Sequence, residues 1–526
     1  MKIRQHSHTS PDISSRSLSR RKKSVVAGLC ALSLLLSGCS FDISVFNHGR
    51  GGGVQIEGDM PAVPAGLEEF YSQDVDWRAC DEESECAEVS APLDYENPGN
   101  GKTVTLALVR YKAQGTPIGT LFVNPGGPGA SGIDYADSIA ISWDEKILRN
   151  FDIVGWDPRG VGQSSAVDCL TDAELDEAIS AWSDYLTDEG LEESEREAKE
   201  IADKCQANSG ELLPYIGTPS TARDLDMLRH LVGDPRLYYY GASYGTAIGA
   251  TYADLFPQNT GRLVLDGAVD LSVPTAEADY LQVLGFERAA RKYVEQCKEN
   301  CPLTGSDDEK MRQIQTFLDS LDKDPLPTSE PERPLTKTLA VYGVILPLYI
   351  SEYDFLSTAL EQAMKQHDGS MLLYLADMYN ERNDDGTYND NSSEAFWAIN
   401  CADYLPTSSE RARENGQRLE NESLAFGAAL SGTDICEAWP YHPDSDPKVP
   451  EAKGAAPILV VGTENDPATP YEWAQSLASQ LESGHLLTWE GGEGHVAFTR
   501  GSKCIDTTIE DFLLTGEIFE GDKTCK

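Results

Sequence analysis

One five-residue motif, Gly241-Ala242-Ser243-Tyr244-Gly245, constrains the fold more than any other part of the sequence. It follows an apolar run at 236–240 (RLYYY) that predicts a strand, and it opens a run of small residues at 244–256 that predicts a helix. A strand that turns sharply into a helix has room only for small residues two positions before and after the serine. The motif therefore predicts a strained turn that exposes the Ser243 hydroxyl at the positive end of a helix.

Other strand-like runs alternate with helix-like runs along the chain, which indicates a mostly parallel sheet covered by helices on both faces. These runs lie at 103–111, 120–123, 151–156, 262–265, 457–462 and 486–489. Between about 270 and 453 strand signals are few, and helices are expected at 281–300 and 354–380, with a proline-rich break at 325–334. We therefore expect an α/β core interrupted by a large helical insertion.

A serine hydroxyl is a weak nucleophile that needs a base, and the base needs an acid to orient it. In α/β-hydrolases these residues follow in the order Ser, Asp or Glu, His. Asp466 comes after the strand-like run at 457–462 and is favoured over Glu464, which lies closer to the strand. His495 ends a glycine-rich loop, GGEGH, whereas His485 begins a strand-like run. We predict an α/β-hydrolase fold with Ser243 as nucleophile, Asp466 as orienting acid and His495 as general base.

The negatively charged intermediate of such a reaction needs two hydrogen-bond donors, an oxyanion hole. One is expected to be the backbone N–H of Tyr244, directly after the nucleophile. The other is expected from the glycine-rich loop at 124–132 (NPGGPGASG), with Gly127 preferred and Gly126 as the alternative. A phosphate-binding loop is the competing interpretation, but no G-K-[ST] pattern follows the loop.

The N-terminus carries an export signature. A basic cluster at 20–23 precedes an apolar run of about 12 residues at 25–36, too short to span a bilayer but typical of a signal peptide. The run ends in Leu-Ser-Gly-Cys39, which resembles a bacterial lipobox, so Cys39 is the expected site of lipidation; an ordinary secretory signal is the alternative. Two acyl chains anchor a protein stably to a membrane. The glycine-rich stretch that follows is expected to be a tether.

Cysteine spacing agrees with export. Apart from Cys30 and Cys39, ten cysteines are left, and they fall into five pairs that are close in sequence: 80 with 86, 169 with 205, 297 with 301, 401 with 436, and 504 with 525. We expect five local disulfides, formed in an oxidising compartment. A zinc site is the weaker alternative because no C-x-x-C or H-E-x-x-H spacing occurs. The acidic helical stretch at 171–209 is expected to be a solvated surface excursion pinned by its disulfide.

The charge balance limits the possible partners. The chain has 42 Lys+Arg and 87 Asp+Glu, a formal net charge of -45. Without residues 1–38, which hold seven basic residues and one acidic residue, the net charge becomes -51. Nucleic acid is therefore an unfavourable partner, because binding its phosphates requires clustered Lys and Arg. No motif implies a metal or an organic cofactor, and nothing in the sequence indicates an oligomeric state.

Five segments together resemble the secreted tripeptidyl aminopeptidase family of actinobacteria, whose relatives include the proline iminopeptidases. They are NPGGPGASG, GWDPRGVGQS (155–164), YYGASYGT, GTENDPATP and GGEGH. The resemblance implies an α/β-hydrolase with a helical cap over its active site that cleaves short peptides from free N-termini. It implies the same triad and suggests that Asp157 and Arg159 stabilise loops.

These observations predict five regions: a lipoprotein signal peptide (1–38), a tether (39–66), a first core segment (67–270), a helical cap (271–455) and a second core segment (456–526). An exopeptidase must bind a charged α-amino group, and Glu394 and Asp403 of the cap are candidate partners for it. The expected activity is that of a lipid-anchored, extracytoplasmic serine exopeptidase acting on oligopeptides. A carboxylesterase or lipase with the same triad is the alternative, and a solute-binding lipoprotein is a third possibility.

Overall fold

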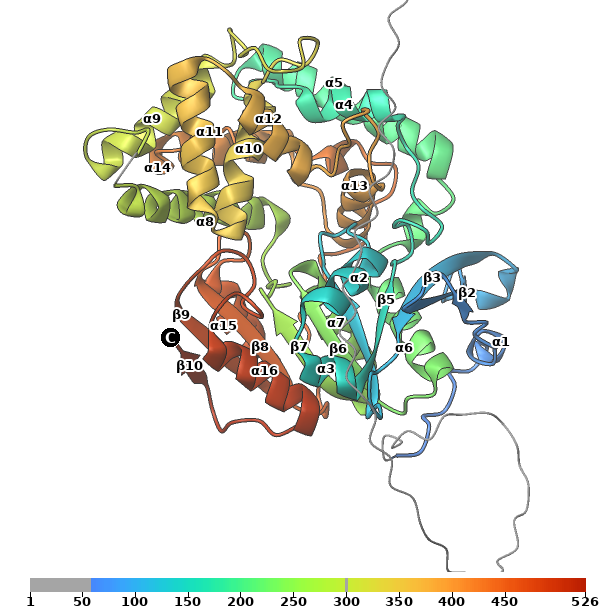
Figure 1. The fold of residues 1–526 in the computed structure, drawn as a ribbon. Coiled ribbons are helices and arrows are strands. Elements are labelled where there is room, and N and C mark those ends of the chain that lie inside the picture. The colour runs from blue at the N-terminus through green and yellow to red at the C-terminus, as the bar shows by residue number, and fades with distance from the viewer. Residues whose placement is uncertain (1–57, 299–300) are drawn as a thin grey trace, which may run out of the picture. The chain divides into compact units, whose positions relative to one another are not determined.

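The computed structural model describes residues 58–298 and 301–526 (Figure 1). The expected signal peptide, the lipidation site Cys39 and most of the expected tether lie outside the described residues. Over the described ranges, no helix is both long and apolar enough to cross a membrane.

The core is built on one sheet whose strands follow the order β1-β2-β3-β5-β4-β6-β7-β8-β9-β10. Strands β1, β2, β3 and β5 pair antiparallel, and every pairing from β5 through β4 to β10 is parallel. This confirms the mostly parallel sheet expected from the sequence. The strands are β1 Arg78–Ala79, β2 Ser84–Pro92, β3 Thr103–Tyr111, β4 Gly119–Asn124, β5 Phe151–Trp156, β6 Leu237–Ala242, β7 Thr260–Asp266, β8 Ile458–Asn465, β9 Gly484–Glu493 and β10 Lys523–Cys525.

Helices cover both faces of the sheet, as the nearly continuous apolar runs of its central strands require. Side chains of α2, α3 and α16 form one apolar layer with the sheet, and side chains of α6, α7 and α15 form the other. The core helices are α1 Glu68–Tyr71, α2 Gly132–Ser142, α3 Glu145–Asn150, α6 Thr218–Val232, α7 Tyr244–Leu255, α15 Tyr471–Gln480 and α16 Lys503–Thr515. Every parallel strand thus directs its carboxyl end to the same edge of the sheet.

Between β7 and β8 the chain forms the helical cap, drawn mostly in yellow and orange in Figure 1. Its centre is a separate apolar cluster around α10, which is rich in Val, Leu, Ile and Ala and buries most of its length. The cap helices are α8 Thr275–Gln296, α9 Asp307–Ser320, α10 Lys337–Ile350, α11 Tyr353–Gln366, α12 Ser370–Tyr379, α13 Ser392–Asp403 and α14 Ser409–Glu422, followed by a short 3-10 turn, η4 Ile435–Ala438. One helix was expected at 354–380, but the chain breaks at His367, whose φ is 54°.

The acidic stretch after β5 is a solvated surface excursion over most of its second helix, as expected, but its first helix packs against the cap. It forms α4 (Asp172–Ser180) and α5 (Asp188–Ser209). Leu175 and Ile179 of α4 are part of the apolar centre of the cap. Asp176 forms an ion pair with Arg382 at 2.8 Å. Figure 1 shows both helices beside the cap rather than beside β5, which precedes them in the chain.

All five expected disulfides are present, which confirms the pairing inferred from sequence proximity. The bond between Cys169 and Cys205 closes the segment that carries α4 and α5, and the bond between Cys401 and Cys436 joins α13 to η4. Five such bonds fit a protein that folds in an oxidising compartment.

Candidate active site

Ser243 lies in the turn between β6 and α7 with φ 54° and ψ −126°, a combination that a side chain rarely tolerates. Its backbone N–H donates to the Asp266 carbonyl at 2.9 Å, which fixes the turn to the end of β7. The flanking glycines have no room for a side chain, because a Cβ at Gly241 would lie 2.4 Å from the Gly245 carbonyl oxygen. The crowding explains why the sequence has glycine two positions before and after the serine, and it leaves the hydroxyl partly exposed.

Asp466 and His495 come together behind this turn. His495 Nδ1 lies 2.9 Å from both carboxylate oxygens of Asp466, and both side chains are buried. Asp466 also accepts hydrogen bonds from the backbone N–H groups of Ala468 and Thr469 at 2.9 Å. A carboxylate held in this way keeps the proton of a neutral imidazole on Nδ1 and leaves Nε2 as the acceptor.

His495 Nε2 is buried and has no hydrogen-bond partner within the described part of the chain. The ring lies against the end of β7, because a Cβ placed on Gly267 would come within 3.0 Å of His495 Cε1. The preceding residue, Asp266, is the one that binds the Ser243 backbone. The imidazole and the serine turn therefore meet at the same strand end. Hydrogen bonds between a catalytic serine and its histidine commonly tighten when substrate binds.

The two alternatives considered for the acid and the base lie elsewhere. Glu464 is exposed, and its carboxylate accepts from the Gly491 N–H at 2.7 Å. His485 is in β9, where its ring packs against Phe519 with the ring centroids 6.0 Å apart. Neither side chain is in the Asp466–His495 pair.

The glycine-rich loop after β4 lies against Ser243. A Cβ on Gly126 would be 2.7 Å from the Tyr244 backbone nitrogen. The Gly126 N–H already donates to Asn124 Oδ1 at 3.0 Å. The N–H groups of Gly127 and Tyr244 have no acceptor among the described residues, and both residues line the same cavity as Ser243. The geometry favours Gly127 over Gly126 as the second donor to an oxyanion.

Asp157 and Arg159 support the loops around this site. Asp157 accepts from Ser131 Oγ at 2.6 Å and from the Gln163 N–H at 2.9 Å. Arg159 is fully buried and pairs with Asp224 at 2.6 Å, and its other N–H groups donate to three backbone carbonyls. Both side chains thus bind protein groups in the loops.

The sequence analysis did not identify the residues that hold the His495 loop in place. Asp266, at the end of β7, accepts from the N–H groups of Ala497 and Phe498 and from the Tyr240 hydroxyl at 2.8–3.2 Å. Burial raises the pKa of this carboxyl, and the backbone donors act against that shift. In the sequence, the indication of this role was the position of Asp266 directly after the strand-like run at 262–265.

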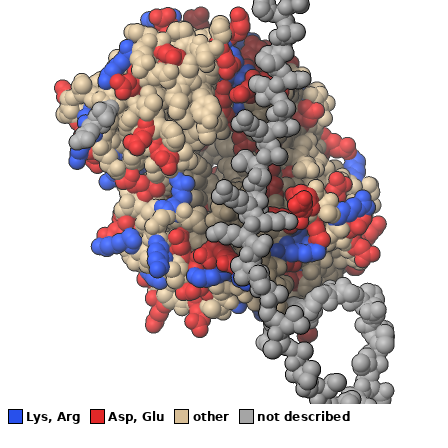
Figure 2. Space-filling view, in the orientation of Figure 1, with Lys and Arg blue, Asp and Glu red and all other residues tan. Residues whose placement is uncertain are grey.

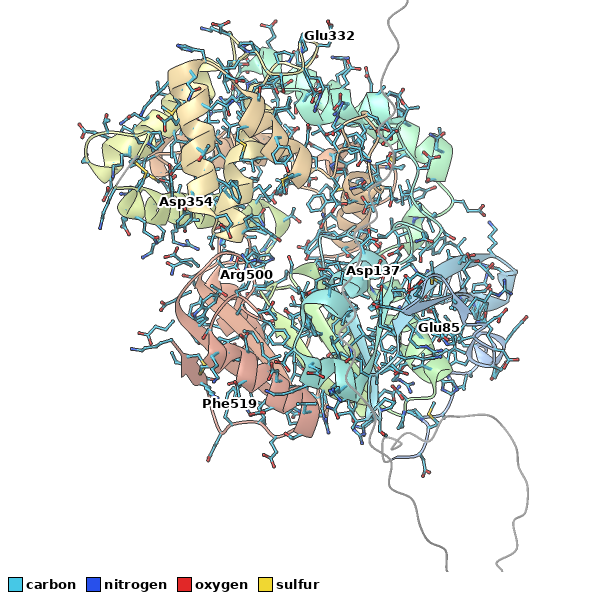
Figure 3. All side chains as sticks on the ribbon, in the orientation of Figure 1. Glu85, Asp137, Glu332, Asp354, Arg500 and Phe519 are labelled. Carbon is cyan, nitrogen blue, oxygen red and sulfur yellow. A yellow bond between two sulfur atoms is a disulfide. The ribbon has the colours of Figure 1, made fainter. Side chains whose placement is uncertain are left out.

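The cap also contacts this loop. The His495 N–H donates to the Tyr349 carbonyl at 2.8 Å, and the two rings are 4.7 Å apart. Arg500, labelled in Figure 3 where the second core segment meets the cap, donates to the Ile350 carbonyl at 2.8 Å. Because these acceptors are backbone carbonyls of α10, no side-chain pattern in the sequence could have revealed them.

A cavity of about 370 Å³ connects Ser243 to the cap, a size typical of small-ligand pockets. The core contributes Gly127, Tyr244 and Thr469, and the cap contributes parts of α8, α13 and the segment 433–436. Aromatic and aliphatic side chains make up much of the wall, together with three carboxylates and no Lys or Arg. Figure 2 shows acidic side chains scattered over the visible face of both core and cap.

Glu394 and Asp403 are not among the residues that line this cavity. Glu394 accepts from the N–H groups of Cys169 and Leu170 at 2.9 and 2.6 Å. Asp403 accepts from the backbone N–H of Thr218 at 2.7 Å and also from its hydroxyl. Both carboxylates therefore bind the protein itself, which corrects the expectation that they hold a substrate's amino group.

Residues 58–298 and 301–526 contain no group of three or more His, Cys, Asp or Glu side chains placed to hold a metal ion. The chemistry available at the site is that of a serine hydroxyl, a buried imidazole–carboxylate pair and two unpaired backbone donors. Such a set can form and hydrolyse an acyl-serine.

Comparisons with known proteins agree with this chemistry. A family model described as TAP-like protein matches residues 422–525. Serine protease Hip1 of Mycobacterium tuberculosis is 36% identical over 533 residues, covering 95% of this chain and 98% of the relative. Carboxylesterase B of the same organism is 36% identical over 446 residues, covering 82% and 84%. Tripeptidyl aminopeptidase of Streptomyces lividans is 28% identical over 477 residues, covering 86% of each chain.

Proposed function

The chain belongs to the TAP-like family of α/β-hydrolases and is a serine hydrolase, and from that premise we propose that it is an exopeptidase. It releases short peptides from the free N-termini of oligopeptides, and Ser243, Asp466 and His495 carry out the reaction. The protein acts outside the cytoplasm on a lipid anchor at Cys39.

The observation that carries the proposal is the cavity that adjoins Ser243. Its wall holds three carboxylates and no basic side chain, so it favours a ligand with a positive end. The α-amino group of a peptide is such an end, and the cap residues that line the cavity limit how much chain fits before the cleaved bond. The names of two relatives, Serine protease Hip1 and Tripeptidyl aminopeptidase, support a peptide as substrate.

The proposed reaction has two steps. Ser243 Oγ attacks the peptide carbonyl carbon while His495 Nε2 takes the hydroxyl proton and passes it to the leaving amine, so that an acyl-serine forms and the downstream peptide departs. Water then attacks the acyl-serine, with His495 again as base. The N–H groups of Gly127 and Tyr244 hold the oxyanion in both steps, and Asp466 stabilises the imidazolium.

The relative named Carboxylesterase B favours a second candidate, an esterase that uses the same residues. A short acyl ester has no ammonium group and would make no use of the acidic cavity wall. Comparing an unblocked tripeptide anilide, its N-acetylated form and a short acyl ester separates the two. An exopeptidase has a higher kcat/KM for the unblocked peptide than for the acetylated one, and an esterase favours the ester.

Ser243→Ala tests the nucleophile. We expect the variant to lose labelling by a fluorophosphonate and to lose roughly 10⁴-fold or more in kcat on the unblocked peptide. A wild-type protein that a fluorophosphonate does not label would instead support a role in capturing peptides without cleaving them.

Metabolic labelling with a radioactive fatty acid tests the anchor. The wild-type chain should take up the label in its bacterial host and sediment with membranes. Cys39→Ala should do neither, while the control Cys30→Ala, within the signal peptide, should behave like the wild type.

A further inference from the structure

The three carboxylates on the cavity wall differ in what they bind. Asp270 accepts from the Ser272 N–H and hydroxyl and from Gln480 Nε2, at 2.6–2.9 Å. Asp434 accepts from the backbone N–H groups of Thr407 and Cys436 at 2.7 and 2.8 Å, at the start of η4. Each of these two carboxylates therefore already accepts hydrogen bonds from donors of the protein.

Asp279 has no such donor. It lies in the second turn of α8, its side chain is exposed and it lines the cavity, yet its carboxylate accepts no hydrogen bond from the residues that the structure describes. Because this carboxylate is open to the cavity and binds no protein donor, water or a ligand in the cavity is the partner available to it.

The surroundings make an ionised Asp279 costly in the empty cavity. Although its side chain is open to the cavity, the protein atoms around it reduce its hydration, and this desolvation together with the negative charge of Asp434 raises the pKa of Asp279 to about 7. An ammonium group bound beside Asp279 would lower this pKa again, because an opposite charge within a few ångströms favours the ionised carboxylate. The wall supplies no Lys or Arg that could fill this role.

We propose that the Asp279 carboxylate receives the N-terminal ammonium group of the substrate. This inference rests on the proposed exopeptidase function and names the residue that determines its specificity. With the scissile carbonyl at Ser243 and the ammonium at Asp279, the length of the released fragment is set by the span of cavity between the two. Asp279 is thus a specificity residue on the acyl side of the cleaved bond.

Asp279→Asn tests the proposal because it removes the charge with almost no change in shape. A hydrogen bond to a charged group is strong enough that its loss should lower kcat/KM for an unblocked tripeptide anilide about 10- to 100-fold, mostly through KM. The N-acetylated peptide has no ammonium to lose, so its kcat/KM should stay near the wild-type value. The readout is the ratio of kcat/KM for the unblocked peptide to kcat/KM for the N-acetylated peptide. General damage to the fold would lower both values and leave this ratio unchanged.

Glu295→Gln is the matched control. Glu295 lies on the same helix as Asp279, but it is exposed and does not line the cavity. Its Oε2 is 3.9 Å from Lys292 Nζ, and its substitution removes the same unit of charge. It should leave the ratio unchanged. Active-site titration with a fluorophosphonate gives the concentration of folded enzyme, and Asp279→Ser replaces the first variant if that one is not obtained folded.

The outcomes are distinguishable. If the wild type prefers the unblocked peptide and Asp279→Asn keeps that preference, the proposal for Asp279 is wrong while the exopeptidase function stands. If the wild type itself shows no preference for the unblocked peptide, the proposed function fails. If Glu295→Gln lowers the ratio as much as Asp279→Asn, the effect comes from net charge and the assignment to Asp279 is also wrong.

Discussion

Replacing Asp266 by asparagine tests whether this buried carboxylate holds the His495 loop against the sheet. Asp266 is fully buried and accepts three hydrogen bonds, from the N–H groups of Ala497 and Phe498 and from the Tyr240 hydroxyl. Asparagine has nearly the same shape but only one acceptor oxygen. If this oxygen keeps the bonds from Phe498 and Tyr240, the new NH₂ group faces the Ala497 N–H, so two donors oppose each other.

The expected cost follows from these contacts. A hydrogen bond to a charged group contributes about 1.5 to 3 kcal/mol, and an unpaired buried donor costs about 1 to 3 kcal/mol. Losing one bond and weakening two should therefore reduce the free energy of unfolding by roughly 2 to 4 kcal/mol. Because His495 is only two residues before Ala497, release of this segment could move the imidazole, and a displacement of about 1 Å would lower kcat roughly 100-fold.

Urea denaturation followed by tryptophan fluorescence measures the stability, and turnover of an unblocked peptide anilide measures kcat. Tyr240→Phe is the control, since it removes one donor to Asp266 and leaves the carboxylate and both backbone bonds in place. It should cost no more than about 1.5 kcal/mol and leave kcat within a few fold.

The reasoning would be refuted if Asp266→Asn unfolded at the wild-type urea concentration and turned over peptide at the wild-type rate. It would also fail if Tyr240→Phe lowered kcat as much as Asp266→Asn does. In that case the Tyr240 hydroxyl, and not the hydrogen bonds from the loop backbone, would account for the effect.

Three further predictions concern the same site and its surroundings. Asp466→Asn should lower kcat about 10⁴-fold with little change in KM, because the amide favours the wrong imidazole tautomer; steady-state kinetics tests this. Gly126→Ala should abolish fluorophosphonate labelling, since its Cβ would lie 2.7 Å from the Tyr244 nitrogen at a φ of 98°; normal labelling would contradict it. Burial raises the pKa of Asp403 to about 7 and of Asp234 to about 6, so the folded state holds these protons more tightly than the unfolded state does. Stability should therefore fall by roughly 2 to 4 kcal/mol between pH 5 and pH 8, and urea midpoints at the two pH values that do not differ would be evidence against it.

The chemistry of the site could be predicted from the sequence because it depends on local geometry. The turn at Ser243 needs glycine on both sides for steric reasons, and that requirement is visible in five consecutive residues. Asp466 and His495 each follow a strand-like run, and parallel strands end at one edge of a sheet, so their meeting follows from the fold class. The disulfides were predictable because each joins cysteines that are close in sequence.

The surroundings of the site could not be predicted in this way. Glu394 and Asp403 had the right charge and lay in the right region, but their partners are backbone groups of segments more than 180 residues away. The acidic stretch at α4 and α5 was expected to be solvated, which holds for most of α5, whereas Leu175 and Ile179 of α4 pack into the apolar centre of the cap. The charge pattern of a sequence does not show which carboxylate already accepts hydrogen bonds from other groups of the protein.

By itself, then, the sequence determined the mostly parallel sheet of the core, its turn at Ser243 and the residues that meet beside that turn, because steric limits and strand periodicity act over a few neighbouring positions. Only the tertiary structure decided which carboxylate faces the cavity without a partner, and which groups hold the His495 loop. Asp279, Asp266 and the Tyr349 carbonyl owe their places to contacts between distant segments. Such contacts depend on how the cap packs on the core, and they leave no periodic pattern in the chain.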